Sequence, residues 1–321
     1  MKIPAFLVLA IANCLAIAAE PFPQKPVTLI VPFAAGGPTD VVARHLGQAM
    51  GNSLGQPVIV ENRPSTGGIV GTEVVARAEP NGYTLLIHNI GMSTLPALSR
   101  TLRFNPQKDF DYIGQVADVP MTLVGKRDLP ATNFKDLQRY LAQNAKIINL
   151  ANAGVGTASH LCGLMLMSKL KIAMTTVPYK GAAPAMTDLQ GGQVDLLCDQ
   201  ITTTLGPIAA GRVKPYVVTT SSRLAALPEV PTLKEQGLSD FEVTVWHGVY
   251  APKNLPKDVS ARLVKALQDA IEDPAFKLSM QKLGAIPVTK EMATPDGLSR
   301  QLHAEIDRWT PVIKAAEAYI D

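Results

Sequence analysis

The sequence has no basic cluster, few cysteines, no recognisable catalytic signature and only one long hydrophobic run. Lys and Arg total 30 against 27 Asp and Glu, so the net charge of +3 is spread along 321 residues. Without a basic patch, this charge gives no reason to expect a nucleic-acid partner. The composition, 47% hydrophobic and 18% charged, is that of a globular protein.

The one long apolar run lies at the N-terminus. Lys2 precedes the apolar residues 3–19, and Ala16-Ile17-Ala18 has the small-x-small spacing of a cleavage site. This pattern predicts a secretory signal peptide over residues 1–19, removed after Ala18 or Ala19. The alternative, a membrane anchor, is disfavoured because the run is short for a span of about 20 residues.

Only three cysteines are present, and Cys14 falls within the predicted signal peptide. Cys162 and Cys198 would remain in the exported chain, where an oxidising compartment would allow them to form a disulfide. Each also lies in an apolar stretch, which suits two buried free thiols. The sequence alone leaves both interpretations open.

The usual catalytic motifs are missing as well. Gly36-Gly37 is not followed by a P-loop Gly-Lys-Ser/Thr, and neither a Gly-x-Ser-x-Gly elbow nor a His-Glu-x-x-His pair occurs. The five histidines are too scattered for metal-ligand spacing. Asp199 falls just after a predicted strand but has no evident acid–base partner. An exported hydrolase that uses Asp199 or His160 therefore remains the alternative to a binding protein.

What the chain does contain is a regular alternation of strand and helix patterns, which predicts an α/β fold with parallel strands. The apolar runs predict strands at 27–33, 58–60, 83–87, 121–125, 147–151, 173–177, 194–198 and 214–219. Helical spacing and capping residues predict helices at 40–54, 67–78, 132–143, 157–169, 184–190, 256–272, 274–283 and 295–318.

Two of the loops between these elements are typical of anion sites. Gly36-Gly37 follows the first strand, and the segment 152–157 follows a later one; each leads into a helix start with hydroxyl side chains nearby. Backbone N–H groups at such a start suit a carboxylate as well as a phosphate. Asp40 and Arg44, four residues apart, are interpreted as a local ion pair rather than as ligand contacts.

The motifs of the chain resemble those of the solute-binding proteins of tripartite tricarboxylate transporters, also called the Bordetella uptake gene receptor family. The resemblance covers most of the predicted mature chain in the family's order. The matching segments are 25–27, 30–40, 43–44, 60–64, 67–68, 71, 80–86, 160–161, 178–181, 189–195, 227–232 and 246–252.

The resemblance implies a type II periplasmic binding protein fold, a Venus flytrap of two α/β lobes joined by two crossing strands with the ligand cleft between them. Lobe one would comprise residues 20–120 plus 247–321, and lobe two residues 121–246. The lobes of such proteins close around their ligand. Cys198 departs from the family pattern, which more often has a bulky apolar residue there.

The resemblance also implies which residues bind a carboxylate, largely through backbone N–H groups. The first lobe would contribute Phe33, Ala34, Gly37, Thr39, Asp40, Ser93 and Thr94. The second would contribute Asn152, Ala153, Gly156, Thr157, Ser159, Tyr179, Lys180 and Asp199. An anion site on each lobe favours a dicarboxylate, and an aromatic one such as terephthalate is the first trial ligand. Asp199 could recognise an amine or a water.

By the same resemblance, the protein would be a periplasmic monomer that uses no cofactor, metal or nucleic acid and is not an enzyme. It would deliver its ligand to membrane transporter subunits. A sensory binding module that docks on a receptor kinase is a further alternative.

Overall fold

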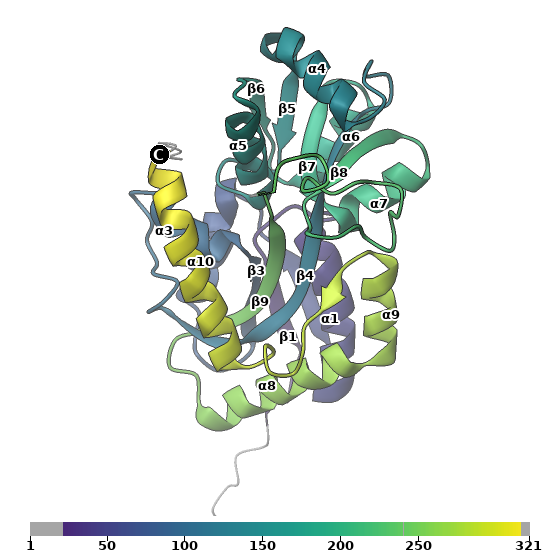
Figure 1. Cartoon of the computed structure of the whole chain (residues 1–321). Coiled ribbons are helices and arrows are strands. Elements are labelled where there is room, and N and C mark those ends of the chain that lie inside the picture. Colours follow the sequence, from purple (N-terminus) through teal and green to yellow (C-terminus); the bar gives the residue numbers. More distant parts are fainter. Residues whose placement is uncertain (1–21, 240, 316–321) are drawn as a thin grey trace, which may run out of the picture.

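The computed structural model describes residues 22–239 and 241–315, so the predicted signal peptide lies outside the described residues. Its strands form one curled sheet in the order β2-β1-β3-β9-β4-β7-β5-β6, with β8 and β10 also paired to β4 (Figure 1). The strands are β1 Val27–Val31, β2 Val58–Asn62, β3 Thr84–Asn89, β4 Phe110–Lys126, β5 Asn149–Asn152, β6 Thr175–Pro178, β7 Leu196–Gln200, β8 Val213–Val218, β9 Thr244–Pro252 and β10 Ile286–Pro287.

Helices pack around this sheet (Figure 1). They are α1 Pro38–Leu54, α2 Ile69–Ala76, α3 Gly91–Leu98, α4 Phe134–Asn144, α5 Ala158–Leu170, α6 Ala182–Gln190, α7 Ile201–Ala209, α8 Lys257–Glu272, α9 Pro274–Lys282 and α10 Pro295–Ala315, with the short 3₁₀ turns Thr66–Gly68 and Ala145–Ile147. α1 packs against α8 and α9, and α10 packs against α3 and β4. Within the described residues, no helix is long and apolar enough to cross a bilayer.

The expected parallel strands are present as two groups of three, joined by antiparallel strands. β1 pairs in parallel with β2 and β3, and β5 pairs in parallel with β6 and β7. The long strand β4 connects the groups, because it pairs antiparallel with β9 as far as Pro120 and with β7 from Met121 onward. The carboxyl ends of the two parallel groups therefore face one another across the middle of the sheet, and we call this boundary the seam.

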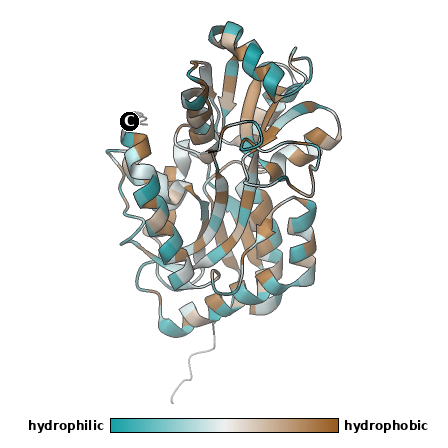
Figure 2. Cartoon of the chain, in the orientation of Figure 1, coloured by the Kyte–Doolittle hydropathy of each residue, from teal (hydrophilic) through white to brown (hydrophobic). Residues whose placement is uncertain are grey.

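Apolar residues gather in the strands and on the inward faces of the helices (Figure 2). The largest fully buried side chains are Trp246, Trp309, Tyr216, Tyr250 and Phe110. Three of these five lie on the long strands β4 and β9, so the connecting strands are also the centre of the core. Burying such aromatic side chains is a major stabilising term for a domain.

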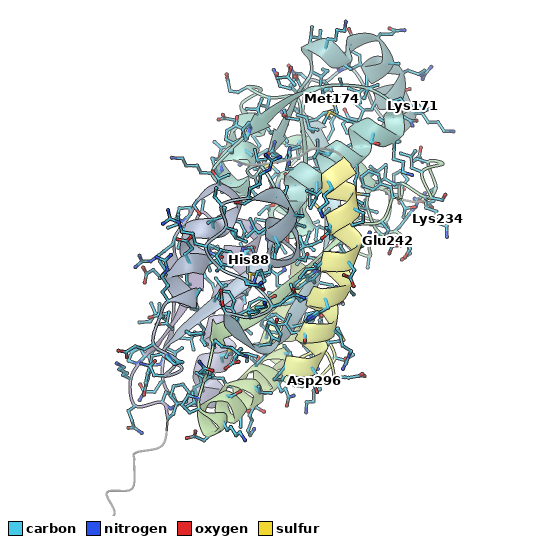
Figure 3. All side chains as sticks on the ribbon, turned by 90° about the vertical axis from the view of Figure 1, so that its left-hand side faces the viewer. His88, Lys171, Met174, Lys234, Glu242 and Asp296 are labelled. Atoms are coloured by element: carbon cyan, nitrogen blue, oxygen red, sulfur yellow. A yellow bond between two sulfur atoms is a disulfide. The ribbon has the colours of Figure 1, made fainter. Side chains whose placement is uncertain are left out.

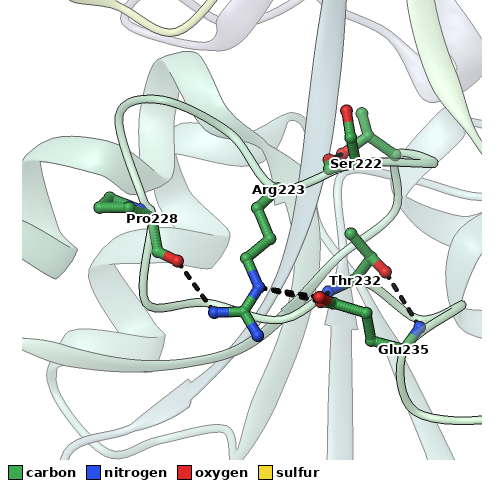
Figure 4. Close-up of polar contacts among 6 residues, drawn as sticks. Ser222, Arg223, Pro228, Thr232 and Glu235 are labelled. Carbon is green, nitrogen blue, oxygen red and sulfur yellow. Dashed lines mark hydrogen bonds and ion pairs between the residues drawn. The ribbon is translucent and has the colours of Figure 1, made fainter.

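The loop between β8 and β9 contains residues 227–232, one of the segments that resemble the family. Polar contacts within this loop fix its conformation (Figure 4). Arg223 Nε donates to both carboxylate oxygens of Glu235 at 3.0 Å, and its Nη1 donates to the Pro228 carbonyl at 3.0 Å. Glu235 also accepts from the Thr232 backbone N–H, while the Thr232 hydroxyl accepts from the Glu235 backbone. These bonds give a long connection a defined shape.

Candidate functional site

A pocket lies at the seam where the parallel strands of both groups end, the usual place for a ligand site in open α/β sheets. Its cavity volume is about 20 Å³, which is room for about one water molecule, so a ligand would enter only if the lining moved apart. The residues that line it are Phe33, Gly37, Pro38, Thr39, Asn89, Ala153, Thr157, Ala158, Ser159, Gly181, Ala182, Asp199 and Gln200. They follow or end β1, β3, β5, β6 and β7.

Four helices begin at this pocket. α1, α5, α6 and α7 have their N-caps at Gly37, Thr157, Gly181 and Gln200, all of which line it. The first N–H groups of a helix lack intrahelical partners, and the helix dipole places about half a positive charge there. The lining contains neither Lys nor Arg. Its positive potential therefore comes from backbone groups.

The loop before α1 is shaped by Asp40, which does not itself line the pocket. Gly36 adopts a left-handed φ of 75°, and its N–H donates to the Asp40 carboxylate at 2.9 Å. Arg44 Nε and Asn62 Nδ2 donate to the same carboxylate, each at 2.9 Å. Burial alone would raise the pKa of Asp40, but these hydrogen bonds outweigh it and lower the pKa. The predicted ion pair between Asp40 and Arg44 is thereby confirmed.

Two buried histidines support the wall formed by the first strand group. The Thr39 hydroxyl lies 3.2 Å from His247 Nε2 and accepts a hydrogen bond from Asn89 Nδ2 at 3.1 Å. His88, which lies inside the molecule (Figure 3), packs its ring edge-to-face against Phe33. Burial lowers the pKa of His88 to about 4 and that of His247 to about 3. Both imidazoles are therefore neutral near pH 7, and they position pocket residues rather than attract an anion.

The side of the pocket formed by β5, β6 and β7 presents hydroxyl and amide groups. Two of these groups have atoms without a hydrogen-bond partner. The Thr157 hydroxyl caps α5 and donates to the Gly154 carbonyl at 2.7 Å. Ser159 and Gln200 are 3% and 4% exposed, and neither Ser159 Oγ nor Gln200 Oε1 has a hydrogen-bond partner. Leaving such a buried polar atom unpaired costs about 1–3 kcal/mol. A ligand in the pocket would be a natural partner for both.

Asp199 is the one acidic residue in the lining, and it is 1% exposed. The Thr203 hydroxyl donates to its carboxylate at 2.5 Å. Burial raises the pKa of Asp199 to about 6, although hydrogen bonds from Thr203 and the Gln200 backbone act in the opposite direction. The group is thus mostly ionised at neutral pH and becomes protonated in mild acid.

The seam brings together seven of the predicted ligand residues, namely Phe33, Gly37, Thr39, Ala153, Thr157, Ser159 and Asp199. The other eight do not line the pocket. Asp40, Asn152 and Tyr179 direct their side chains to protein groups, and Ser93 and Thr94 donate to backbone carbonyls of the Ile90–Gly91 turn. Ala34 and Gly156 contact the opposite strand group, and Lys180 is exposed. The ligand-binding roles remain predictions.

Six lining residues were not predicted: Pro38, Asn89, Ala158, Gly181, Ala182 and Gln200. Most are chain neighbours of predicted ones, so reading each helix start as a unit would have included them. Asn89 ends β3, and Gln200 ends β7 directly after Asp199. Their positions at strand ends were the available signal.

Cys162 and Cys198 form a disulfide, with their Cα atoms 6.1 Å apart. This settles the choice that the sequence left open. The bond joins α5 to β7, and both elements line the pocket at their ends. It therefore links two parts of the same wall.

The described residues give little support for an active centre. His160 does not line the pocket, and its Nδ1 accepts a hydrogen bond from the Gly156 backbone. No group of three or more His, Cys, Asp or Glu side chains in the described part of the chain could hold a metal ion.

Comparison with known proteins gives consistent matches over almost the whole chain. The family model for the tripartite tricarboxylate transporter family receptor, TctC, matches residues 42–317. A UPF0065 protein from the TAR-I ttuE-ttuC' intergenic region of Agrobacterium vitis is 45% identical over 299 residues, which span 93% of this chain and 86% of that protein.

Solved structures agree with this match. The periplasmic binding protein BugD is 47% identical, with a TM-score of 0.91 and coverage of 93% of this chain and 99% of that one. MatC from Rhodopseudomonas palustris, solved with bound malate, is 35% identical with a TM-score of 0.87 and covers 91% and 100% of the two chains. These relatives are solute-binding proteins, not enzymes.

Proposed function

Because the chain belongs to the tripartite tricarboxylate transporter receptor family, we propose that it captures a small dicarboxylate in the pocket at the sheet seam and delivers it to a tripartite membrane transporter. The family's binding proteins are periplasmic and bind carboxylates with the two-lobe fold. The chain is a solute-binding protein rather than an enzyme.

The observation that carries this proposal is the convergence of four helix N-termini on a pocket without a cationic side chain. Backbone N–H groups at helix starts bind carboxylates as they bind phosphates. The unpartnered hydroxyl of Ser159 adds a donor that no protein group uses. Together these groups match an anion that carries its charge on oxygen atoms.

A dicarboxylate is proposed because helix N-termini reach the pocket from both strand groups. α1 follows β1 on one side, and α5, α6 and α7 follow β5, β6 and β7 on the other. Each side can therefore hold one carboxylate. Aliphatic dicarboxylates and the aromatic terephthalate are both candidates, since nothing in the backbone pattern selects between them.

Closure of two lobes is part of the proposal, with lobe one at 20–120 plus 247–321 and lobe two at 121–246. The change of strand partner along β4 between Pro120 and Met121 supports this division. We also propose that residues 1–19 are a cleaved signal peptide and that the mature protein is a monomer.

The test is a thermal-shift panel of carboxylates on purified ligand-free protein, followed by calorimetry on those that stabilise it. Ligand at about 100 times its Kd should stabilise the protein by about 2.7 kcal/mol. The bound compound should be recovered unchanged, whereas a hydrolase would convert it. Folded protein that responds to no carboxylate would contradict the proposal.

A matched pair of serine variants localises the site. Ser159→Ala removes the unpartnered pocket hydroxyl, so carboxylate affinity should fall by about tenfold, as for the loss of one hydrogen bond to a charged group. Ser168→Ala alters an exposed serine on the same helix and should leave the Kd unchanged. Equal affinities in both variants would remove Ser159 from the site.

A further inference from the structure

Asp199 is an unexpected residue in a pocket that binds an anion, because its carboxylate is itself negatively charged. A buried carboxylate repels an incoming carboxylate, and no salt bridge to Asp199 is found among the described residues. Its known partners are the Thr203 hydroxyl and the Gln200 backbone N–H. A carboxylate has about four acceptor positions on its two oxygens. Asp199 therefore keeps acceptor capacity beside the bound ligand.

Gln200, the next residue, presents a second acceptor. Its side chain lines the pocket at 4% exposure, and Oε1 has no donor. Two adjacent residues at the end of β7 thus accept hydrogen bonds that the protein does not fully supply. Plain dicarboxylates, fully ionised, have only acceptors and cannot donate to Asp199, whereas the Gln200 amide can also turn its N–H₂ group toward a carboxylate.

We propose that Asp199 and Gln200 form a specificity wall that selects carboxylates with a hydrogen-bond donor, a hydroxyl or an ammonium, on the carbon next to a carboxylate. The proposal rests on the proposed function and narrows it. The helix N-termini bind the carboxylates, and Asp199 and Gln200 accept hydrogen bonds from the substituent on the carbon between the two carboxylates.

Physical chemistry favours a marked preference of this kind. A site that hydrogen-bonds a ligand N–H or O–H discriminates strongly against an analogue without it, because its buried acceptors are then left unpaired. With the pKa of Asp199 at about 6, the group is an ionised acceptor at neutral pH. An ammonium would also neutralise the charge of Asp199, whereas a hydroxyl would supply only the hydrogen bond.

The experiment compares ligands that differ only in the donor. Calorimetry at pH 7.5 would measure Kd for succinate, malate and aspartate, for glutarate, 2-hydroxyglutarate and glutamate, and for terephthalate with its 2-hydroxy and 2-amino derivatives. Within the skeleton that binds, the substituted acid should bind at least tenfold more tightly than the plain one. The comparison of hydroxyl with amine identifies which donor the wall takes.

The variant Asp199→Asn keeps an oxygen for the Thr203 hydroxyl but adds an N–H₂ group and removes the charge. It should reduce the preference for the substituted acid at least tenfold. Gln200→Met, which removes the amide, should also reduce it. Asp195→Asn is the matched control, since Asp195 lies just before β7 and bonds Lys126 and the Asn149 backbone outside the pocket. The control should leave every Kd unchanged.

The outcomes separate the two proposals. A plain dicarboxylate that binds as tightly as its substituted forms, or a preference that survives in both Asp199→Asn and Gln200→Met, overturns the specificity wall and leaves carboxylate binding intact. Absence of binding by every carboxylate tested, in folded protein, overturns both.

Discussion

At the residue scale, Asp199 should weaken the ligand-free protein at neutral pH. Its pKa is about 6 in the folded state, against an ordinary value of 3.8 for an aspartate. The folded state therefore binds this proton more tightly, so stability falls as pH rises from about 4 to about 6. The difference of about two pKa units corresponds to about 3 kcal/mol. Asp199→Asn should raise the free energy of unfolding at pH 7 by up to that amount.

Urea denaturation of both proteins at pH 7 and pH 4 measures this effect. Because Asp199 is protonated in both states well below pH 4, the advantage of the variant should shrink as the pH falls. A variant that is less stable than the wild type at pH 7 would show that the Asp199 carboxylate has a favourable partner in the ligand-free protein.

The same residues show how far sequence could reach. Gly37, Thr157 and Ser159 could be predicted because a glycine or hydroxyl residue at a helix start is a local pattern. Asn89 and Gln200 gave only the weaker signal of an amide at a strand end, which indicates a site only when other strands end beside it. Tyr179 was predicted to contact the ligand, but its hydroxyl donates to Asp188 at 2.6 Å, and no sequence motif predicts that contact.

At the element scale, the disulfide should stabilise the wall that α5 and β7 form together. Cys162 and Cys198 are 36 residues apart in sequence. Closing a loop of that length lowers the entropy of the unfolded chain by the equivalent of about 4 kcal/mol. Replacing both cysteines with alanine should therefore lower the free energy of unfolding by about 3–4 kcal/mol in urea denaturation.

Reductant provides the control for this prediction. It should shift the wild type toward the midpoint of the double variant and leave the double variant unchanged. A wild-type midpoint that is insensitive to complete reduction would mean that the bond adds nothing to stability.

Elements also differ in how well local patterns predict them. The helix predicted at 256–272 is α8 Lys257–Glu272, because its apolar spacing lies within one segment. The apolar pattern predicted only residues 121–125 of β4, since its first half is defined by pairing with β9, more than 120 residues away. α3 was missed because Gly91 and Pro96 are poor helix formers, and packing against α10 compensates for them.

At the scale of the whole molecule, the two strand groups touch across the pocket through very small residues. Gly181 has a φ of 133°, and a Cβ placed on it would lie 2.9 Å from Ala34 Cβ. The Thr94 hydroxyl donates to the Gly156 carbonyl at 3.3 Å, also between the two groups. These contacts hold the two strand groups close together. The proposed lobes could adopt this closed arrangement only while the residues in contact have small side chains.

Enlarging one side of the seam should therefore hold the lobes apart. Ala34→Phe places a large ring where Gly181 now packs, so ligand affinity should fall at least tenfold. Small-angle X-ray scattering should show that ligand makes the wild type more compact but not this variant. Ala35→Phe, at the exposed neighbouring position, should behave as the wild type. If Ala34→Phe closes normally on ligand, the contact between Ala34 and Gly181 does not limit closure, and the seam must tolerate larger side chains by shifting the loops themselves.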